Sequence, residues 1–299
     1  MEDVHQLKVF RAVAQQLSFT RAAEGLYLTQ SAVSHAIAAL ERDLGAMLFT
    51  RQGRSVRLTE AGRVLLEHTP RVFAALDEAT QRVKQAARPE LGRLRIGVSP
   101  AGCQYLLPES IREFRESYPS YSLAIDVADS PRVAELLHEG RIDLGVLLRT
   151  ERSKRLVFHE LFRDELGLIA SPHHPWARAG RVDRAQLAEQ HFVLYTRTST
   201  TFRLVERHLA KLGTPLHDYL ELGSMEAIKE IVKLGMGVSV VAKWIAASEL
   251  RDGSLVWLNL PGPRLVRTWC VASAAGRRLA IAEQTFIGLL RQVGQELGH

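Results

Sequence analysis

The sequence predicts a mixed α/β protein in which a small helical domain and one long helix precede a larger α/β domain. Apolar residues recur at helical spacing from Leu7 to Leu44, and a stretch with heptad-like spacing follows. From Leu94 onward, short apolar runs typical of buried strands alternate with amphipathic helices. Such alternation is typical of a parallel sheet with crossover helices.

The chain has 299 residues, of which 46% are apolar, so two or three folded units are expected. Its net charge of +6 favours a polyanionic partner if the charge is concentrated on one face. The N-terminus lacks a signal-peptide pattern, and no apolar run reaches membrane-spanning length. We therefore expect a cytoplasmic protein with no membrane partner. The two cysteines, Cys103 and Cys270, are too few for a disulfide framework or a four-ligand zinc site.

The first part of the chain predicts three short helices. An apolar face on the first consists of Leu7, Phe10, Val13, Ala14 and Leu17. Ser18 can cap a second helix over residues 19–26, and a tight turn follows at Tyr27 and Leu28. Thr29 offers the N-cap of a third helix that ends at Gly45. The buried stripe of this third helix is predicted to be Val33, Ile37, Leu40 and Leu44.

Polar side chains lie opposite that stripe, at the start of the third helix. They are Gln30, Ser31, Ser34 and His35, all able to reach base edges or phosphates. Strand-like residues on either side of Gln52 and Gly53 then predict a basic hairpin, with Arg51, Arg54 and Arg57 available to neutralise phosphates. Together these features predict a winged helix-turn-helix that binds double-stranded DNA. The alternative is that these are solvated polar positions on a small helical domain.

The run LSFTRAAEGLYLTQSAVSHAIAALERDLGAMLFTRQGRSVRLTEAG resembles the N-terminal signature of LysR-type transcriptional regulators. The resemblance implies that Gln30, Ser31, Ser34 and His35 face DNA and that Arg51 and Arg54 lie on the wing. Thr29, at the N-cap of the same helix, is a further candidate DNA-binding residue. Ser31 stands where proline is usual in the family, and His35 and Ala36 stand where basic and amide residues are frequent. The operator sequence therefore cannot be copied from a relative.

A long helix is predicted from Thr59 to about Arg88, interrupted by Pro70. Its apolar seam is Leu65, Thr69, Val72, Leu76, Ala79 and Val83. A helix of this length has no core of its own, so the seam implies a partner helix, most simply from a second subunit. Packing on its own domain is the alternative. The resemblance implies a homodimer through this linker helix. We expect the chain to work as a dimer or as a dimer of dimers, that is, a homotetramer.

The rest of the chain is similar to the effector domain of the same family. That domain resembles a two-lobed periplasmic binding protein (type 2) with a ligand cleft between its lobes. The resemblance implies a DNA-binding domain over 1–58, a linker helix over 59–90 and an effector-binding domain over 91–299. Within the last, it implies a first lobe of 92–161 plus 266–299 and a second lobe of 162–265.

Three loops at strand ends are expected to line the cleft, because helix N-termini there direct free N–H groups at a ligand. Their hydroxyl and amide groups favour an anionic, carboxylate-bearing effector. The candidate effector-binding residues are Ser99, Ala101, Gln104, Arg149, Thr198, Ser199, Thr201 and Met225. Ordinary helix caps and solvated arginines, including Arg149 and Arg197, are the alternative interpretation. Ala101 replaces a frequent threonine of the family and Phe202 a common arginine, so the effector cannot be assigned by likeness.

Other classes of function are less well supported. The lobes alone would fit a solute-binding component, but that class needs an export signal and no DNA-binding domain. Neither a dinucleotide fingerprint nor a phosphate-binding P-loop occurs, and no nucleophile with an orienting base is visible. We expect no enzymatic activity, no cofactor and no metal. A thiolate at Cys103 leaves a redox switch open, although a packing role is the simpler interpretation.

Overall fold

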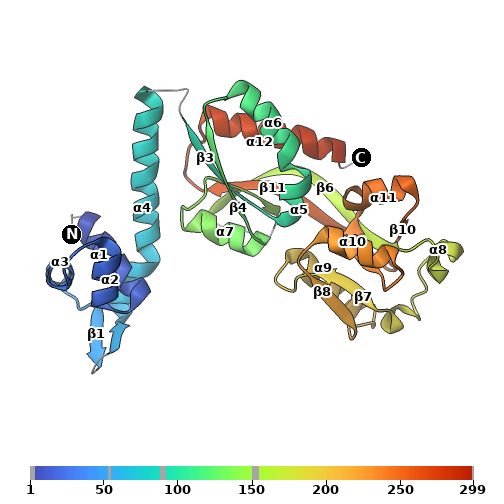
Figure 1. Cartoon of the computed structure of the whole chain (residues 1–299), viewed down its shortest axis with the longest axis horizontal. Helices are drawn as coiled ribbons and strands as arrows, with labels where there is room; N and C mark the ends of the chain where they lie inside the picture. The colour runs from blue at the N-terminus through green and yellow to red at the C-terminus, as the bar shows by residue number, and fades with distance from the viewer. Residues whose placement is uncertain (1–3, 53–54, 88–91, 150–154, 298–299) are drawn as a thin grey trace. The chain divides into compact units, whose positions relative to one another are not determined.

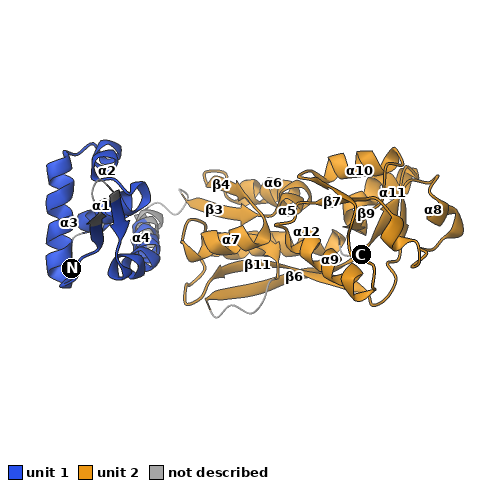
Figure 2. Ribbon diagram, turned by 90° about the horizontal axis from the view of Figure 1, so that it is seen from below, with its two compact units in different colours: residues 1–80 blue, residues 81–299 orange. Residues whose placement is uncertain are grey.

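The computed structural model describes residues 4–52, 55–87, 92–149 and 155–297. The chain divides into two compact units, residues 1–80 and residues 81–299 (Figure 2). Arg54 lies outside the described residues. Within the described ranges, no helix is both long enough and apolar enough to span a bilayer.

The first unit contains the predicted helices and hairpin. They are α1 (Val4–Gln16), α2 (Phe19–Leu26), α3 (Gln30–Leu44), β1 (Phe49–Gln52) and β2 (Ser55–Leu58). The Ser18 hydroxyl accepts a hydrogen bond from the Arg21 amide at 3.3 Å, and the Thr29 hydroxyl accepts one from Ala32 at 3.2 Å. Gly45 ends α3 with φ of 64°, where other residues are strained. The predicted caps are therefore confirmed.

Aromatic rings hold the helices of the first unit to the wing. Phe10 and Phe19 both contact Phe49, with ring centroids 5.5 and 5.8 Å apart. Two predicted core positions are wrong. Leu17 follows the end of α1 with φ of 46° and is 49% exposed, because the left-handed backbone turns its side chain off the helix face. Leu44, in the last turn of α3, extends past the core and is also exposed.

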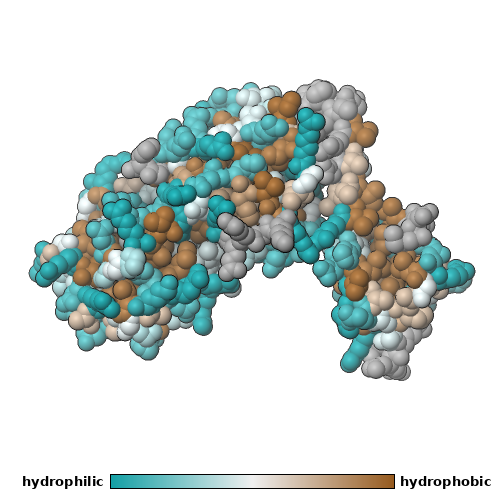
Figure 3. Space-filling model, turned by 180° about the vertical axis from the view of Figure 1, so that it is seen from behind, coloured by the Kyte–Doolittle hydropathy of each residue, from teal (hydrophilic) through white to brown (hydrophobic). Residues whose placement is uncertain are grey.

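The long helix α4 (Glu60–Ala87) begins where the sequence predicts, since the Thr59 hydroxyl accepts a hydrogen bond from the Gly62 amide at 3.0 Å. Its first turns pack on the core of the first unit. Further along, the seam has no cover within the described chain: Val72 and Leu76 are each 39% exposed, and Val83 is 70% exposed. Figure 3 shows apolar surface along this helix.

The second unit alternates strands and helices. Its first half contains β3 (Arg93–Val98), α5 (Pro100–Tyr105), α6 (Leu107–Ser117), β4 (Ser122–Val127), α7 (Ser130–His138) and β5 (Leu144–Leu148). The long strand β6 (Leu156–Ala170) leads to α8 (Pro175–Ala179), β7 (Phe192–Tyr195), α9 (Thr200–Lys211), β8 (Tyr219–Leu222) and α10 (Met225–Lys233). The chain ends with β9 (Ser239–Ala242), α11 (Ala247–Asp252), β10 (Val256–Leu258), β11 (Leu265–Ala274) and α12 (Ile281–Leu297).

The sheets are mixed, which corrects the prediction of a parallel sheet. Parallel pairs join β3 to β4, β3 to β5 and β7 to β8. Strands β9, β10 and β11 instead pair antiparallel with β6. The strand order of the larger sheet is β10-β6-β11-β5-β3-β4. The direction changes because the chain leaves the first half along β6 and returns beside it along β11.

Strands β6 and β11 connect two lobes (Figure 1). We call lobe I the part with β3, β4, β5, α5, α6, α7 and α12, and lobe II the part with β7 to β10 and α8 to α11. The two strands pair from Leu265 opposite Leu166 to Ala274 opposite Leu156, with a bulge between Trp269 and Cys270. This bulge lies opposite Leu161, at the boundary that the sequence predicts between the lobes. One apolar core continues through both lobes.

Candidate functional site

The start of α3 presents polar side chains to solvent. Thr29, Gln30, Ser31 and His35 are exposed and Ser34 is half-buried. The Gln30 amide nitrogen donates a hydrogen bond to the Ser34 hydroxyl at 2.9 Å. This bond holds the glutamine along the helix while its remaining donor and acceptor stay available. The structure thus brings the five candidates together on one exposed polar surface at the start of α3. We call this surface, formed by Thr29, Gln30, Ser31, Ser34 and His35, the polar shoulder of α3.

The wing is fixed to α3 by Glu41. Its Oε1 atom accepts hydrogen bonds from the Leu48 amide at 2.7 Å and the Phe49 amide at 3.2 Å. Arg51 belongs to β1, so its backbone lies on this wing. Tyr27 was missed by the sequence analysis as a surface candidate: it is 97% exposed in the turn before α3, with φ of 56°.

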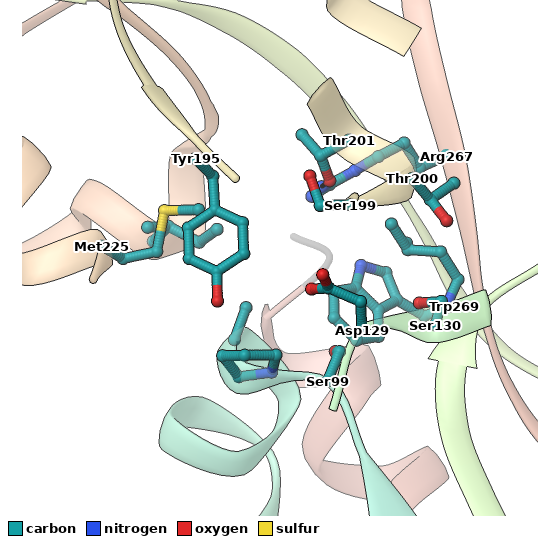
Figure 4. Close-up of a pocket in the computed structure, with 14 residues that line it drawn as sticks. Ser99, Asp129, Ser130, Tyr195, Ser199, Thr200, Thr201, Met225, Arg267 and Trp269 are labelled. Carbon is teal, nitrogen blue, oxygen red and sulfur yellow. Dashed lines mark hydrogen bonds between the residues drawn. The ribbon is translucent and has the colours of Figure 1, made fainter. Parts of the chain in front are cut away.

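A small pocket lies between the lobes, with a volume of about 40 Å³ (Figure 4). It lies where β3, β5 and β7 end and where α7, α9 and α10 begin. The lining side chains are Ser99, Pro100, Ala101, Asp129, Ser130, Leu148, Tyr195, Ser199, Thr200, Thr201, Met225, Ile245, Arg267 and Trp269. A volume of this size holds a few water molecules or a small ion.

Five of the predicted effector residues line this pocket: Ser99, Ala101, Ser199, Thr201 and Met225. The other three do not. Gln104 donates its amide to Glu226 Oε1 at 2.7 Å instead. Arg149 follows Leu148 at the end of β5, and because successive strand residues face opposite sides, it points away toward Glu160 at 4.0 Å. Thr198 lies beside the pocket and donates its hydroxyl to Asp129.

Arg267 is the buried cation that the sequence analysis did not identify. Its Nε atom donates to Asp164 Oδ1 at 2.9 Å, and a second guanidinium nitrogen contacts the other carboxylate oxygen. The third nitrogen donates to the Thr201 hydroxyl at 2.7 Å. Trp244 and Trp269 also donate their indole N–H groups to Asp164, at 2.9 and 3.1 Å. Asp164 therefore balances the arginine charge and satisfies both indoles.

Two pocket hydroxyls have no hydrogen-bond partner within the described residues. They belong to Ser99, which is 8% exposed, and to Thr200 at the start of α9. Both oxygen atoms are almost fully buried, and a buried hydroxyl without a partner is unfavourable. Rotation of either side chain into the pocket would offer its hydroxyl to a ligand. Ser199 caps α9 by accepting a hydrogen bond from the Phe202 amide at 3.0 Å. The adjacent N–H groups of the first turn add a partial positive charge.

A polar cluster joins the lobes next to this pocket. Glu226 of α10 accepts hydrogen bonds from Gln104 at 2.7 Å and from the Tyr105 hydroxyl at 2.9 Å, both on α5. Lys229 contacts Glu226 at 2.9 Å and the buried Glu249 at 3.0 Å. Burial and the hydrogen bond to Glu226 raise the pKa of Tyr105 to about 12. The phenol therefore remains a donor throughout the neutral range.

Glu226 itself experiences opposing effects. Burial raises its pKa, whereas hydrogen bonds from Lys229, Tyr105 and Gln104 lower it. The hydrogen bonds together outweigh burial, so the pKa of Glu226 lies below its ordinary value. The carboxylate is thus ionised at neutral pH and holds α10 of lobe II to α5 of lobe I. Met225, the residue before Glu226, lines the pocket. A change in the pocket wall at Met225 would therefore also move Glu226 and its contacts with α5.

Comparison with known families matches both parts of the chain. Residues 4–63 match the bacterial regulatory helix-turn-helix proteins of the lysR family, and residues 87–295 match the LysR substrate binding domain. The chain is 29% identical over 287 residues to the HTH-type transcriptional activator CmpR of Synechocystis, covering 96% of this chain and 94% of CmpR. It is 32% identical over 283 residues to the RuBisCO operon transcriptional regulator of Allochromatium vinosum, covering 95% and 93%.

Solved structures share the fold. The structure of full-length CbnR complexed with its target DNA is similar with a TM-score of 0.66 and 21% identity, covering 98% of this chain and all of that one. These relatives are transcriptional regulators rather than enzymes. Together with the exposed helix-turn-helix and the pocket between two lobes, the matches show that this chain belongs to the LysR family of DNA-binding transcriptional regulators.

Proposed function

We propose that the start of α3 reads an operator in the major groove. Thr29, Gln30, Ser31, Ser34 and His35 would make the base and nearby phosphate contacts. Arg51 and Arg54 would neutralise phosphates from the wing. The observation that supports this most directly is the exposed polar shoulder of α3. It follows the short turn after α2, a helix that packs in the core of the first unit.

Full DNA binding would require two copies of the chain. The uncovered seam on α4 supports a homodimer through this helix, because Val72, Leu76 and Val83 repeat at helical spacing on exposed positions. A second set of contacts between effector domains would then produce a dimer of dimers. Such a homotetramer places several recognition helices on one operator.

The proposed limits of the domains follow the sequence: DNA-binding domain 1–58, linker helix 59–90 and effector domain 91–299. The match of residues 4–63 to the helix-turn-helix family supports the first limit approximately. The bulge opposite Leu161 supports a lobe boundary at 161 and 162. We expect the protein to act in the cytoplasm, because bacterial operator DNA lies in that compartment.

The small-molecule effector would bind in the pocket between the lobes through an acidic group. The support is chemical: the N-terminal residues of α9 line the pocket, and the first turn of a helix carries a partial positive charge. Ser99 and Thr200 beside it have buried hydroxyls without a partner, which a side-chain rotation would bring to a ligand. We propose Ser99, Ala101, Ser199, Thr201 and Met225 as lining residues. Gln104 and Thr198 would act indirectly, through Glu226 and Asp129. Arg149 would reach the effector only after a change of side-chain direction.

The size of the pocket suggests how the effector controls DNA binding. A ligand that needs more room than this narrow pocket offers would have to move the lobes apart. Such a movement would bend β6 and β11 near the bulge and break the Gln104–Glu226 contact. In an oligomer, a new angle between lobes changes the spacing of the DNA-binding domains. Operator binding or DNA bending would then respond to the effector.

Single substitutions separate the two kinds of DNA contact. Gln30→Ala is expected to relax sequence preference at one position, because a bidentate amide contact contributes about 1–3 kcal/mol of discrimination. Arg51→Ala is expected to weaken binding to all duplexes and to reduce the slope of log K against log salt concentration by about 1. Binding to a randomised operator library at several salt concentrations measures both. Unchanged sequence preference in Gln30→Ala would contradict the assignment of α3.

A further inference from the structure

Asp129 is an acidic side chain in the wall of the pocket. It precedes α7, yet its carboxylate makes no hydrogen bond that caps this helix. The carboxylate instead accepts hydrogen bonds across the pocket from the hydroxyls of Thr198 and, at 3.4 Å, Thr196. Figure 4 shows it directed into the pocket, on the side of Tyr195. Asp129 therefore lies where an effector would be contacted by both lobes.

The charge of Asp129 is not balanced by the pocket. Among the described residues that line it, the charged side chains are Asp129 and Arg267. The Arg267 guanidinium is already paired with Asp164, and both of these side chains are almost completely buried. Asp129 is left with neutral hydroxyl partners and the partial positive charge of the α7 N-terminus, and no side chain of opposite full charge in the pocket lining is free to pair with it. Burial raises the pKa of Tyr195, and the negative charge of Asp129 raises it further, so the phenol beside Asp129 stays neutral.

A simple carboxylate would therefore be a poor fit for this pocket. Its negative charge would be attracted by the hydroxyls and the first turn of α9 but repelled by Asp129. A ligand that also carries a cation satisfies both ends of the pocket. A protonated amine facing Asp129 would replace the Thr198 hydroxyl as donor and would form a charge-assisted hydrogen bond.

We propose that the effector is a zwitterion, with an acidic group held by the first-turn N–H groups of α9 and by the Ser99 and Thr200 hydroxyls once they rotate toward it, and a protonated amine held by Asp129. This inference rests on the proposed effector site and specifies its chemistry. Asp129 is then the residue that distinguishes amino acids from the corresponding acids without an amine. Loss of its contact with Thr198 on ligand binding removes a direct hydrogen bond between lobe I and lobe II.

Two matched series of acids test this specificity. The first is L-alanine, L-lactate and isobutyrate, which differ by an amine, a hydroxyl or a methyl at one position. The second is γ-aminobutyrate, γ-hydroxybutyrate and valerate. Dissociation constants are measured with the full-length protein by titration calorimetry. In at least one series the amine is expected to bind about 10- to 100-fold more tightly than its methyl counterpart, as expected for a hydrogen bond between charged groups.

The variant Asp129→Asn keeps the size of the side chain and its acceptor oxygen but removes the charge. It is expected to reduce the preference for the amine to less than about threefold and to bind isobutyrate or valerate more tightly than the wild type does. Asp126→Asn is the matched control, because Asp126 is an exposed aspartate of β4 that does not line the pocket. This control should retain the wild-type preference.

The outcomes separate this inference from the proposed site. If acids without an amine bind as tightly as their amine counterparts, and Ser99→Ala weakens them all, the effector site stands and the role of Asp129 is wrong. An amine preference that persists in Asp129→Asn also overturns the inference. If no acid of either series binds to the wild type or to Asp129→Asn, both the acidic effector and the zwitterion are contradicted.

Discussion

Replacing Asp164 by alanine is expected to lower the free energy of unfolding by about 3–5 kcal/mol, the cost of leaving one charge of a buried pair without its partner. The Arg267 guanidinium would lose its counterion, and the indole N–H groups of Trp244 and Trp269 would lose their acceptor. All three groups are buried between the lobes. Urea unfolding of the full-length protein, followed by tryptophan fluorescence, measures the change, because two of the reporting indoles contact Asp164 itself.

Glu165→Ala provides the control for this experiment. Glu165 is the next residue of β6 and is half-buried, and its ion pair with the exposed Arg264 spans 3.7 Å. Its loss should cost less than about 1 kcal/mol. Similar costs for the two variants would show that Asp164 does not stabilise the fold by pairing with Arg267 and the two indoles.

A charge placed in the α4 seam is expected to separate the subunits. In Leu76→Glu a carboxylate replaces an apolar side chain that is 39% exposed in the single chain and that the proposed partner helix would cover. Sedimentation velocity should show dissociation of the oligomer at micromolar concentration. Operator affinity should fall by about 100-fold or more, because the gain from linking two recognition helices is lost.

Arg71→Glu introduces the same side chain at an exposed residue that is not three or four positions from any residue of the seam. It should leave the oligomer and operator affinity nearly unchanged. If Leu76→Glu remains as oligomeric as Arg71→Glu, the α4 seam is not the subunit interface.

Local signals explain which parts of the fold could be predicted from the sequence. Ser18, Thr29 and Gly45 determine helix ends through contacts with residues three or four positions away, and these ends were predicted correctly. The short helices α5, α8 and α11 were missed, because five or six residues do not show a helical period. The directions of β6 and β11 were also missed, since these depend on pairing between strands far apart in the chain.

The same distinction applies to the pocket. Ser99, Ser199 and Thr201 follow or precede recognisable elements, so strand ends predicted them as lining residues. Arg267 interacts with Asp164, 103 residues away, and nothing near either residue indicates this partner. Asp129 has the position of an ordinary helix cap, and only the structure shows its carboxylate turned toward Thr198 instead.

DNA binding by this protein is proposed to depend on the polar shoulder at the start of α3 together with the wing. The most direct measurement is a competition assay at low ionic strength, in which the full-length protein chooses among duplexes from the neighbourhood of its own gene and an unrelated duplex of equal length. We expect a preference of about a thousandfold or more for at least one duplex from the neighbourhood of the gene. Equal affinity for every duplex would contradict it.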